Sequence, residues 1–300
     1  MDRLEAMSVL LAAVETGSLS AAGRKLEMPL PTVSRKVSEL ETHIGTRLLH
    51  RSTRRLTLTD AGQAYVDACK RILNDVDEAE RAAAGEYTAP RGDMVVTAPI
   101  VFGRLHVVPV TTEFLKAYPE VDVRLVLGDR VIDLLDDRVD LAVRIGELPD
   151  STLVATRIGS IRQVVCGSPT YFAERSKPKR PDQLSKHDCI SFDPLTSAGT
   201  WKFPAGKTDE SVAIHSRLVV NTAEAAIAAA IAGAGITRVL SYQIASAQKT
   251  GELDVVLNKF EPKPWPVSLV YAGQGRLPLK LRAFLDFSIP RLRARLSAID

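Results

Sequence analysis

The chain has 300 residues, 45% of them hydrophobic, which is enough for two or three domains that each bury a core. Its formal net charge of +3 excludes a uniformly basic or acidic protein. The charge is uneven, however. Residues 24–55 contain eight Lys/Arg against three Asp/Glu, which favours a polyanionic partner for this segment alone, although an ordinary solvated basic surface would give the same count.

Three helices are predicted in the first 45 residues. Apolar side chains recur at helical spacing over residues 4–14, and Ser18 and Ser20 can cap a second helix after them. Pro31 suits the first turn of a third helix, where a missing N–H costs little, and apolar residues at offsets of 4, 7 and 11 follow over residues 33–44. Two helices joined by a tight turn, the second with a polar outer face, are typical of a helix-turn-helix.

The start and outer face of the third helix carry the side chains that we expect to contact DNA. They are Pro31, Thr32, Ser34, Arg35, Lys36 and Ser38. Such a helix fits the major groove, where an arginine can form two hydrogen bonds with a guanine edge. Ser18 and Ser20, beside the free N–H groups of a helix start, are suited to hold a backbone phosphate. Taken singly, each residue is equally compatible with an ordinary cap or surface charge.

Residues 48–59 predict two short strands joined by a basic turn. A β-wing of this kind can meet backbone phosphates or a narrow, electronegative minor groove. The wing residues expected to contact DNA are Arg51, Thr53, Arg54 and Arg55.

Five segments match a known pattern in order: Ala21-Ala22, Val33-Ser34-Arg35, Leu40-Glu41, Gly45-Thr46-Arg47-Leu48-Leu49 and Leu56-Thr57-Leu58-Thr59-Asp60-Ala61-Gly62. Together they resemble the winged helix-turn-helix of the LysR-type transcriptional regulators. The resemblance implies a sequence-specific regulator that uses Thr32, Ser34, Arg35, Arg51 and Arg54 on DNA. Leu30 departs from the family, whose members often carry a polar residue, commonly Gln, just ahead of the recognition helix.

A long helix is predicted from about 61 to 84, after the DNA-binding domain at 1–60. Its narrow apolar stripe includes Tyr65, Ala68, Ile72, Val76 and Ala79. Such a stripe suits pairing between two copies of the chain, although it could also pack on its own wing domain. A two-fold dimer would match half-sites about 34–36 Å apart on DNA. Residues 85–92 are rich in turn-forming residues and predict a hinge.

From residue 93 the pattern alternates between strands and helices. The expected elements are strands at 94–98, 121–127 and 141–145, helices at 100–117 and 131–137, a second set over 164–255 that includes a helix at 222–232, and a final strand at 267–271 and helix at 277–296. Apolar strands separated by helices indicate an α/β domain whose parallel sheets are covered on both faces.

This half also matches a known pattern, at Ala98-Pro99, Phe102-Gly103, Pro109, residues 114–119, residues 140–146 and Gly233-Ala234-Gly235-Ile236. It is similar to the effector domain of LysR-type regulators. The resemblance implies an effector-binding domain at 93–300 with the fold of type 2 periplasmic-binding proteins. Lobe I would comprise about 93–161 and 267–300, and lobe II about 162–266, with a ligand cleft between them.

In such a fold we expect the cleft to be lined by the carboxyl ends of strands. The candidate effector-binding residues are Pro99, Ile100, Val101, Phe102, Arg144, Gly146, Ser168, Asn221 and Thr222. A helix start at Ile100 would favour an anionic ligand group. Residues 100–102 offer no Ser or Thr, which favours a more apolar effector, and Arg144 fits either an anion or an intramolecular salt bridge.

No catalytic motif or metal-ligand spacing is present, so we expect no enzyme activity, metal or cofactor. The three widely spaced cysteines suit reduced thiols, and no secretory or membrane-spanning segment is predicted, so the expected location is the cytoplasm. The expected partners are double-stranded DNA, a small-molecule effector, RNA polymerase and further copies of the chain, as a dimer or tetramer. An alternative is a redox-sensing regulator that uses Cys166 or Cys189.

Overall fold

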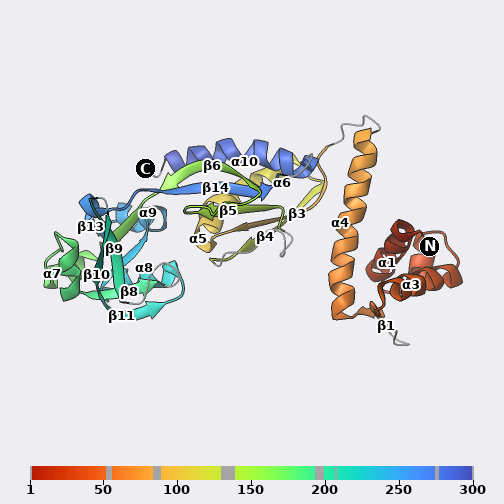
Figure 1. The fold of residues 1–300 in the computed structure, drawn as a ribbon, viewed down its shortest axis with the longest axis horizontal. Coiled ribbons are helices and arrows are strands. Elements are labelled where there is room, and N and C mark those ends of the chain that lie inside the picture. The colour runs from red at the N-terminus through yellow and green to blue at the C-terminus, as the bar shows by residue number, and fades with distance from the viewer. Residues whose placement is uncertain are drawn as a thin grey trace. The chain divides into compact units, whose positions relative to one another are not determined.

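The computed structural model describes residues 2–51, 56–83, 89–129, 139–192, 199–206, 208–273 and 277–298. The chain forms two compact units, Met1–Gly92 and Asp93–Asp300 (Figure 1). The wing residues Thr53, Arg54 and Arg55, the helix expected over 131–137 and residues 85–88 of the expected hinge lie outside the described residues.

The N-terminal unit is a helical bundle with one hairpin. Its elements are α1 (Arg3–Thr16), α2 (Leu19–Lys25), α3 (Leu30–Ile44), β1 (Leu49–Arg51), β2 (Leu56–Leu58) and α4 (Asp60–Ala83). The predicted apolar face of α3 is confirmed, because Val33, Val37 and Leu40 are fully buried against α1 and the hairpin.

The helix ends follow the chemistry of the sequence. The Ser18 hydroxyl accepts a hydrogen bond of 3.0 Å from the Ala21 N–H and so caps α2, whereas Ser20 lies inside the first turn and caps nothing. α3 ends at Gly45, whose φ of 75° lies in the left-handed region that favours glycine. These caps fix where the turn between α2 and α3 begins and where α3 gives way to the hairpin.

The base of the hairpin is pinned to the start of α4. The Thr59 hydroxyl donates to the Arg47 carbonyl at 2.8 Å and accepts from the Gly62 N–H at 2.9 Å. Gly62 lies so close to the hairpin that a Cβ added to it would be 2.0 Å from the Leu48 carbonyl oxygen. The backbone of residues 47–48 therefore depends on glycine at position 62.

α4 has two distinct faces. Val66 and Cys69 are buried and turn toward the core of the N-terminal unit. The predicted stripe lies about 90° round the helix from that face, by the 100° turn per residue of an α-helix. Ile72, near its middle, is 41% exposed. Tyr65 is partly buried against the core, so the alternative in which the stripe packs on its own unit applies to this residue. Ala68 and Val76 are half-buried, and Ile72 and Ala79 are exposed.

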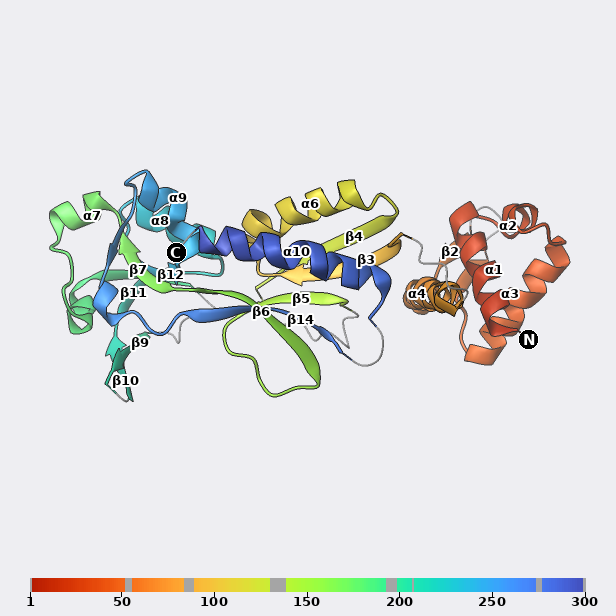
Figure 2. The same ribbon diagram turned by 90° about the horizontal axis from the view of Figure 1, so that it is seen from above.

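Among its described residues, the second unit contains two five-stranded sheets, each with helices packed on it, and a separate two-stranded hairpin (Figure 2). Its first half consists of β3 (Gly92–Ala98), α5 (Ile100–Phe102), the π-helical turn η1 (Gly103–Val107), α6 (Val108–Ala117), β4 (Val121–Leu127), β5 (Leu141–Ile145), β6 (Leu153–Ile161), β7 (Gln163–Gly167), α7 (Pro169–Glu174), the 3-10 helix η2 (Pro181–Lys186) and β8 (Asp188–Phe192). Its second half consists of β9 (Thr200–Ala205), β10 (Thr208–Ala213), β11 (His215–Val220), α8 (Ala223–Ile231), β12 (Ile236–Leu240), α9 (Ser241–Lys249), β13 (Asp254–Val256), the 3-10 helix η3 (Asn258–Phe260), β14 (Trp265–Ala272) and α10 (Leu279–Ser297).

The expectation of parallel sheets is wrong in part, because both sheets are mixed. The first lobe has the strand order β4-β3-β5-β14-β6, in which β14 is antiparallel to both neighbours. The second lobe has the order β11-β8-β12-β7-β13, in which β7 is antiparallel to both neighbours. β7 and β14 are the strands that begin immediately after the chain has crossed between the lobes, which reverses their direction relative to the neighbouring strands.

The sheet of the second lobe is buried on both faces, as its continuous apolar runs predict. Cys166 and Ile190 point toward α8 and α9, and their chain neighbours Val165 and Cys189 point toward α7 and the hairpin of β9 and β10. This alternation is the two-residue period of a strand.

Two segments cross between the lobes, one at Arg162 and the other before Trp265. The strands that lead into them are paired, with Trp265 opposite Ile161. The Arg162 guanidinium contacts both carboxylate oxygens of Glu261, at 3.0 and 3.2 Å, so one ion pair ties the two crossings together.

In the described parts of the chain, no individual helix has both the length and the apolar composition of a membrane span; α1 and α2 meet these criteria only when taken together, as a pair bent by 114°.

Candidate nucleic-acid interface and effector site

The outer face of α3 presents Arg35 to solvent. Its side chain is 69% exposed and makes a long contact of 4.0 Å with Glu39, one turn further along the helix. Pro31 and Leu30 are also exposed, while Thr32, Ser34 and Ser38 are half-buried at the edge of the same face. Arg35 is therefore extended away from the core, as a residue that reads base edges must be.

Lys36 does not lie where the sequence pattern placed it. Its Nζ pairs with the Glu5 carboxylate on α1, and its side chain is only 16% exposed. The long, flexible lysine stem lets the ammonium turn back toward the neighbouring helix. Lys36 thus holds α3 against α1 and is not on the outer face.

The wing is described only at its base. β1 and β2 pair antiparallel, with Leu49 opposite Leu58 and Arg51 opposite Leu56. The backbone of Arg51 is described and its side chain is not, so the predicted contacts of Arg51, Thr53 and Arg54 with DNA stay predictions.

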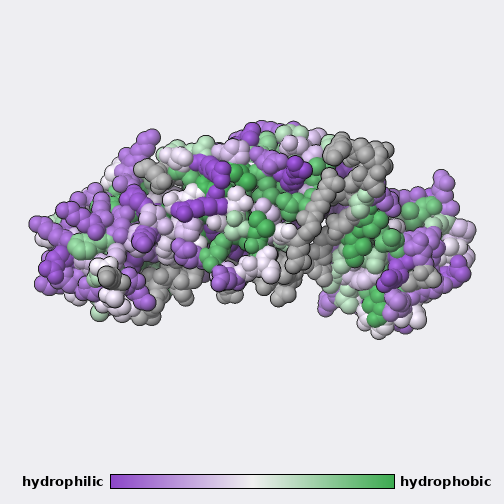
Figure 3. Space-filling model, turned by 45° about the horizontal axis from the view of Figure 1, so that its top comes forward, coloured by the Kyte–Doolittle hydropathy of each residue, from purple (hydrophilic) through white to green (hydrophobic). Residues whose placement is uncertain are grey.

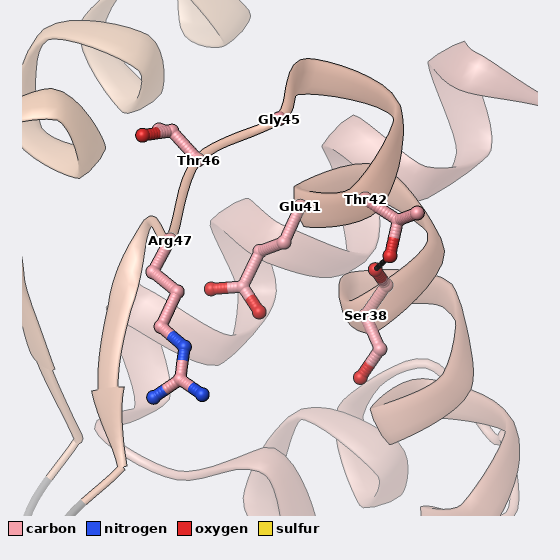
Figure 4. Close-up of a pocket in the computed structure, with 6 residues that line it drawn as sticks. All are labelled: Ser38, Glu41, Thr42, Gly45, Thr46 and Arg47. Atoms are coloured by element: carbon pink, nitrogen blue, oxygen red, sulfur yellow. Dashed lines mark hydrogen bonds between the residues drawn. The ribbon is translucent and has the colours of Figure 1, made fainter.

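A depression of about 410 Å³ opens between the second half of α3 and the start of the wing (Figure 4). We call it the α3–wing notch, and it is lined by Ser38, Glu41, Thr42, Gly45, Thr46 and Arg47. A second depression, lined by Arg35, Ser38, Glu39, Thr42 and His43, shares Ser38 and Thr42 with it. Sequence reasoning counted Arg47 only as one of the basic residues of this region and did not place it beside α3.

In the second unit, most of the candidate effector residues lie where the lobes meet. β3 and β5 are parallel, so Pro99–Phe102 and Arg144–Gly146 follow strands that end at the same edge of the first sheet. That edge faces the second lobe, because β6 leaves it for the crossing at Arg162. On the other side, Asn221 and Thr222 follow β11, and Arg104 reaches Glu224 across the lobes at 2.8 Å.

Ser168 lies at the opposite end of the second lobe. It follows β7, which runs antiparallel to β12 and away from the crossing, so its carboxyl end is far from the first lobe (Figure 1). There the Ser168 hydroxyl caps α7 by accepting from the Tyr171 N–H at 3.3 Å. The assumption that every strand ends at the cleft holds only for parallel strands, and Ser168 is not a cleft residue.

The helix start at Ile100 already faces a carboxylate of the chain itself. Asp129, which follows β4, accepts a hydrogen bond of 3.1 Å from the Ile100 N–H. Because helix starts attract negative charge, Asp129 fills the place expected for an anionic ligand group. Sequence reasoning missed Asp129, although its position directly after a predicted strand was the available signal.

Aromatic rings from both lobes meet beside this carboxylate. The ring centroids of Phe102 and Tyr242 are 5.5 Å apart, and His106 lies 4.8 Å from Phe102 and 5.6 Å from Tyr242. Burial lowers the pKa of His106 to about 4, so its ring is neutral near pH 7. Burial also lowers the pKa of the Arg144 guanidinium, which remains the charged group among the candidate residues.

The cysteines of the second unit are poorly placed for redox chemistry. Burial raises the pKa of the Cys166 and Cys189 thiols to about 12, which keeps them protonated, whereas the thiolate is the reactive form. They lie two strands apart, on opposite faces of the same sheet. An internal disulfide requires Cα atoms within about 7 Å and converging Cβ vectors, so these two cysteines cannot form one without a large rearrangement.

Two family profiles cover most of the chain. The one described as "Bacterial regulatory helix-turn-helix protein, lysR family" matches residues 4–63. The one described as "LysR substrate binding domain" matches residues 88–293.

Relatives align over nearly the whole length. An "HTH-type transcriptional regulator" of Xanthomonas campestris pv. campestris is 35% identical, with 95% of this chain and 84% of that protein covered. The "HTH-type transcriptional activator AaeR" of Escherichia coli is 31% identical, with 95% and 93% covered. The solved structure of CrgA, a LysR-type transcriptional regulator from Neisseria meningitidis, superposes with a TM-score of 0.62 at 30% identity, covering 96% of this chain and 98% of that one. The full-length structure of the Vibrio cholerae virulence activator AphB superposes with a TM-score of 0.61 at 26% identity, covering 96% of this chain and 99% of that one.

Proposed function

The chain belongs to the LysR family of bacterial transcriptional regulators, and from this we propose that it binds a dyad-symmetric promoter site as a dimer or tetramer under the control of a small molecule. The DNA-binding part would be residues 1–60, followed by the linker helix at 61–84, a hinge at 85–92 and the effector-binding part at 93–300. Its place of action would be the cytoplasm, with RNA polymerase as a further partner at the promoter. The observation that carries the proposal is the exposed Arg35 on the outer face of α3.

The DNA-binding proposal is tested by Arg35→Ala in a gel-shift series against the DNA upstream of the protein's own gene. We expect a loss of about 1–3 kcal/mol in binding free energy and relaxed preference at one base position in each half-site. Lys116→Ala, which removes one exposed positive charge from the other unit, is the control and should bind as the wild type does. If Arg35→Ala and the wild type bind every sequence with equal affinity, Arg35 does not read bases.

Leu30 is the expected source of a distinct sequence preference. It is 46% exposed at the first position of α3. A leucine offers no hydrogen bond to a base edge but packs against the methyl group of thymine, as other apolar side chains do.

Dimerisation through α4 is supported by the exposed stripe. Ile72 and Ala79 are exposed and Val76 is half-buried. Figure 3 shows where hydrophobic and hydrophilic residues lie on one face of the molecule. Pairing two such stripes would bury them and place two copies of α3 for two half-sites.

The effector proposed for the interlobe site is neutral and largely apolar. Pro99, Ile100, Val101, Phe102, Arg144, Gly146, Asn221 and Thr222 would contact it. Asp129 already occupies the helix start at Ile100, and Glu224 already pairs with Arg104, so two of the groups that attract anions are engaged.

Matched pairs of carboxylic acids and their amides test this class of effector by thermal shift. We expect the amide of a binding pair to stabilise the second unit, by about 2.7 kcal/mol at 100 times its dissociation constant, and the acid to do so less. Asp129→Asn should reduce the discrimination between the two. A stronger shift by the acid with the wild-type protein would refute the assignment.

A further inference from the structure

The α3–wing notch lies on the side of α3 that faces away from the core. The notch and the second depression share Ser38 and Thr42 and together form a trough along the outer face of the helix, with Arg47 lining the notch and Arg35 the second depression. A trough of this kind beside a recognition helix is where a DNA strand flanking the major groove would run if α3 entered that groove.

Arg47 and Ser38 lie on opposite sides of the notch, with Glu41 between them (Figure 4). Arg47 is exposed and extends its guanidinium alongside α3. The Ser38 hydroxyl donates to the Ser34 carbonyl at 2.8 Å, a bond that it can exchange for a stronger acceptor in the notch.

The backbone that carries Arg47 is held from both sides. One carboxylate oxygen of Glu41 accepts from the N–H groups of Leu48 and Leu49, at 2.9 and 3.1 Å. The Thr59 hydroxyl donates to the carbonyl of Arg47 itself at 2.8 Å. A group built on a fixed backbone loses less entropy when it binds a ligand, which makes Arg47 a preorganised contact.

We propose that Arg47, assisted by Ser38, binds one backbone phosphate of the DNA in the α3–wing notch. The inference rests on the proposed DNA-binding function and adds a contact to it. A guanidinium matches a phosphate with two parallel charge-assisted hydrogen bonds, and the serine hydroxyl adds a third donor.

Two groups oppose a negative charge in the notch, and N–H groups of the chain already bond both of them. The C-terminal end of α3 carries a partial negative charge, but the N–H groups of Gly45 and Thr46 already bond its last carbonyls. The Glu41 carboxylate is engaged by the two amides of the wing. The remaining repulsion between these groups and a phosphate requires a full positive charge nearby. Arg47 therefore contributes most of the binding free energy of the phosphate, and Ser38 contributes less.

Arg35 and Arg47 therefore have different roles. A phosphate contact holds the protein in register and contributes equally on every sequence, whereas a base contact discriminates among sequences. Arg47 is thus expected to set the affinity of the interface without altering which site is preferred.

The experiment is a salt titration of DNA binding by the full-length chain, on its own upstream site and on an unrelated duplex. For Arg47→Ala we expect affinity to fall about tenfold on both duplexes and the log–log salt slope to become shallower by about 0.9, the value for one phosphate contact. Arg47→Lys should keep the wild-type slope and recover part of the affinity. Ser38→Ala should lose a few-fold in affinity with no change in slope.

Thermal unfolding of each variant establishes that it is folded, and the exposed charge control Lys116→Ala should leave the slope unchanged. An unchanged slope for folded Arg47→Ala overturns the phosphate assignment, and so does a loss confined to the specific site. A wild-type protein that does not distinguish its upstream site from the unrelated duplex would instead overturn the proposed function, so the two failures are separable.

Discussion

Ile72→Glu is expected to halve the oligomeric mass of the protein and to weaken binding to a two-half-site operator by about 100-fold or more. The substitution places a charge in the middle of the exposed stripe of α4, where pairing would have to bury it. A protein that has lost its pairing engages one half-site at a time and so loses the effective concentration that the second contact supplies. Light scattering at micromolar concentration and gel shifts measure the two effects.

Asn74→Glu is the matched control for this prediction. It adds the same side chain two residues further along α4, on the opposite side of the helix from the stripe, because each residue turns by 100°. This variant should keep the wild-type mass and affinity. Equal behaviour of the two variants would show that the stripe is not the pairing surface.

Gly62→Ala is expected to destabilise the N-terminal unit by about 3 kcal/mol. Helix propensity alone predicts the opposite, a gain of about 1 kcal/mol for alanine over glycine in a helix. The new Cβ would lie 2.0 Å from the Leu48 carbonyl oxygen, which belongs to the backbone and cannot rotate away. The unfolding temperature of the unit, followed by calorimetry, should fall by more than about 10 °C.

The neighbouring exposed residue provides the comparison. Gln63→Ala removes only a side-chain contact of 3.2 Å with Asp67 and should change stability by no more than about 0.5 kcal/mol. If Gly62→Ala proves as stable as Gln63→Ala, the wing base is not packed against α4 as the structure shows.

The helices of the DNA-binding unit could be predicted because their signals are local. The period of Val33, Val37 and Leu40 and the cap at Ser18 each lie within a few residues of the feature that they determine. Lys36 could not be placed in this way. It lies at the edge of the apolar face of α3, and only the distant Glu5 on α1 decides which way its ammonium turns.

The α/β character of the second unit could likewise be predicted from the sequence, but the direction of each strand in its sheet could not. An apolar run indicates a buried strand equally well whichever way it points. Ser168 was expected in the cleft, but β7 runs away from the crossing, so the residue that follows this strand lies at the other end of the lobe. Asp129 was missed because its partner Ile100 is 29 residues away in the sequence. The contact forms only when β3 and β4, which precede these two residues, lie side by side.

The paired crossings, tied by Arg162 and Glu261, also restrict how the lobes can move. The ladder of β6 and β14 ends at Ile161 and Trp265, and the ion pair lies just beyond it, so sliding one crossing against the other would break both. We therefore expect the lobes to move relative to each other mainly by changing their angle of opening. An effector that contacts Phe102 in one lobe and Thr222 in the other would change mainly this angle. Its binding free energy would then favour one opening angle of the lobes over the others.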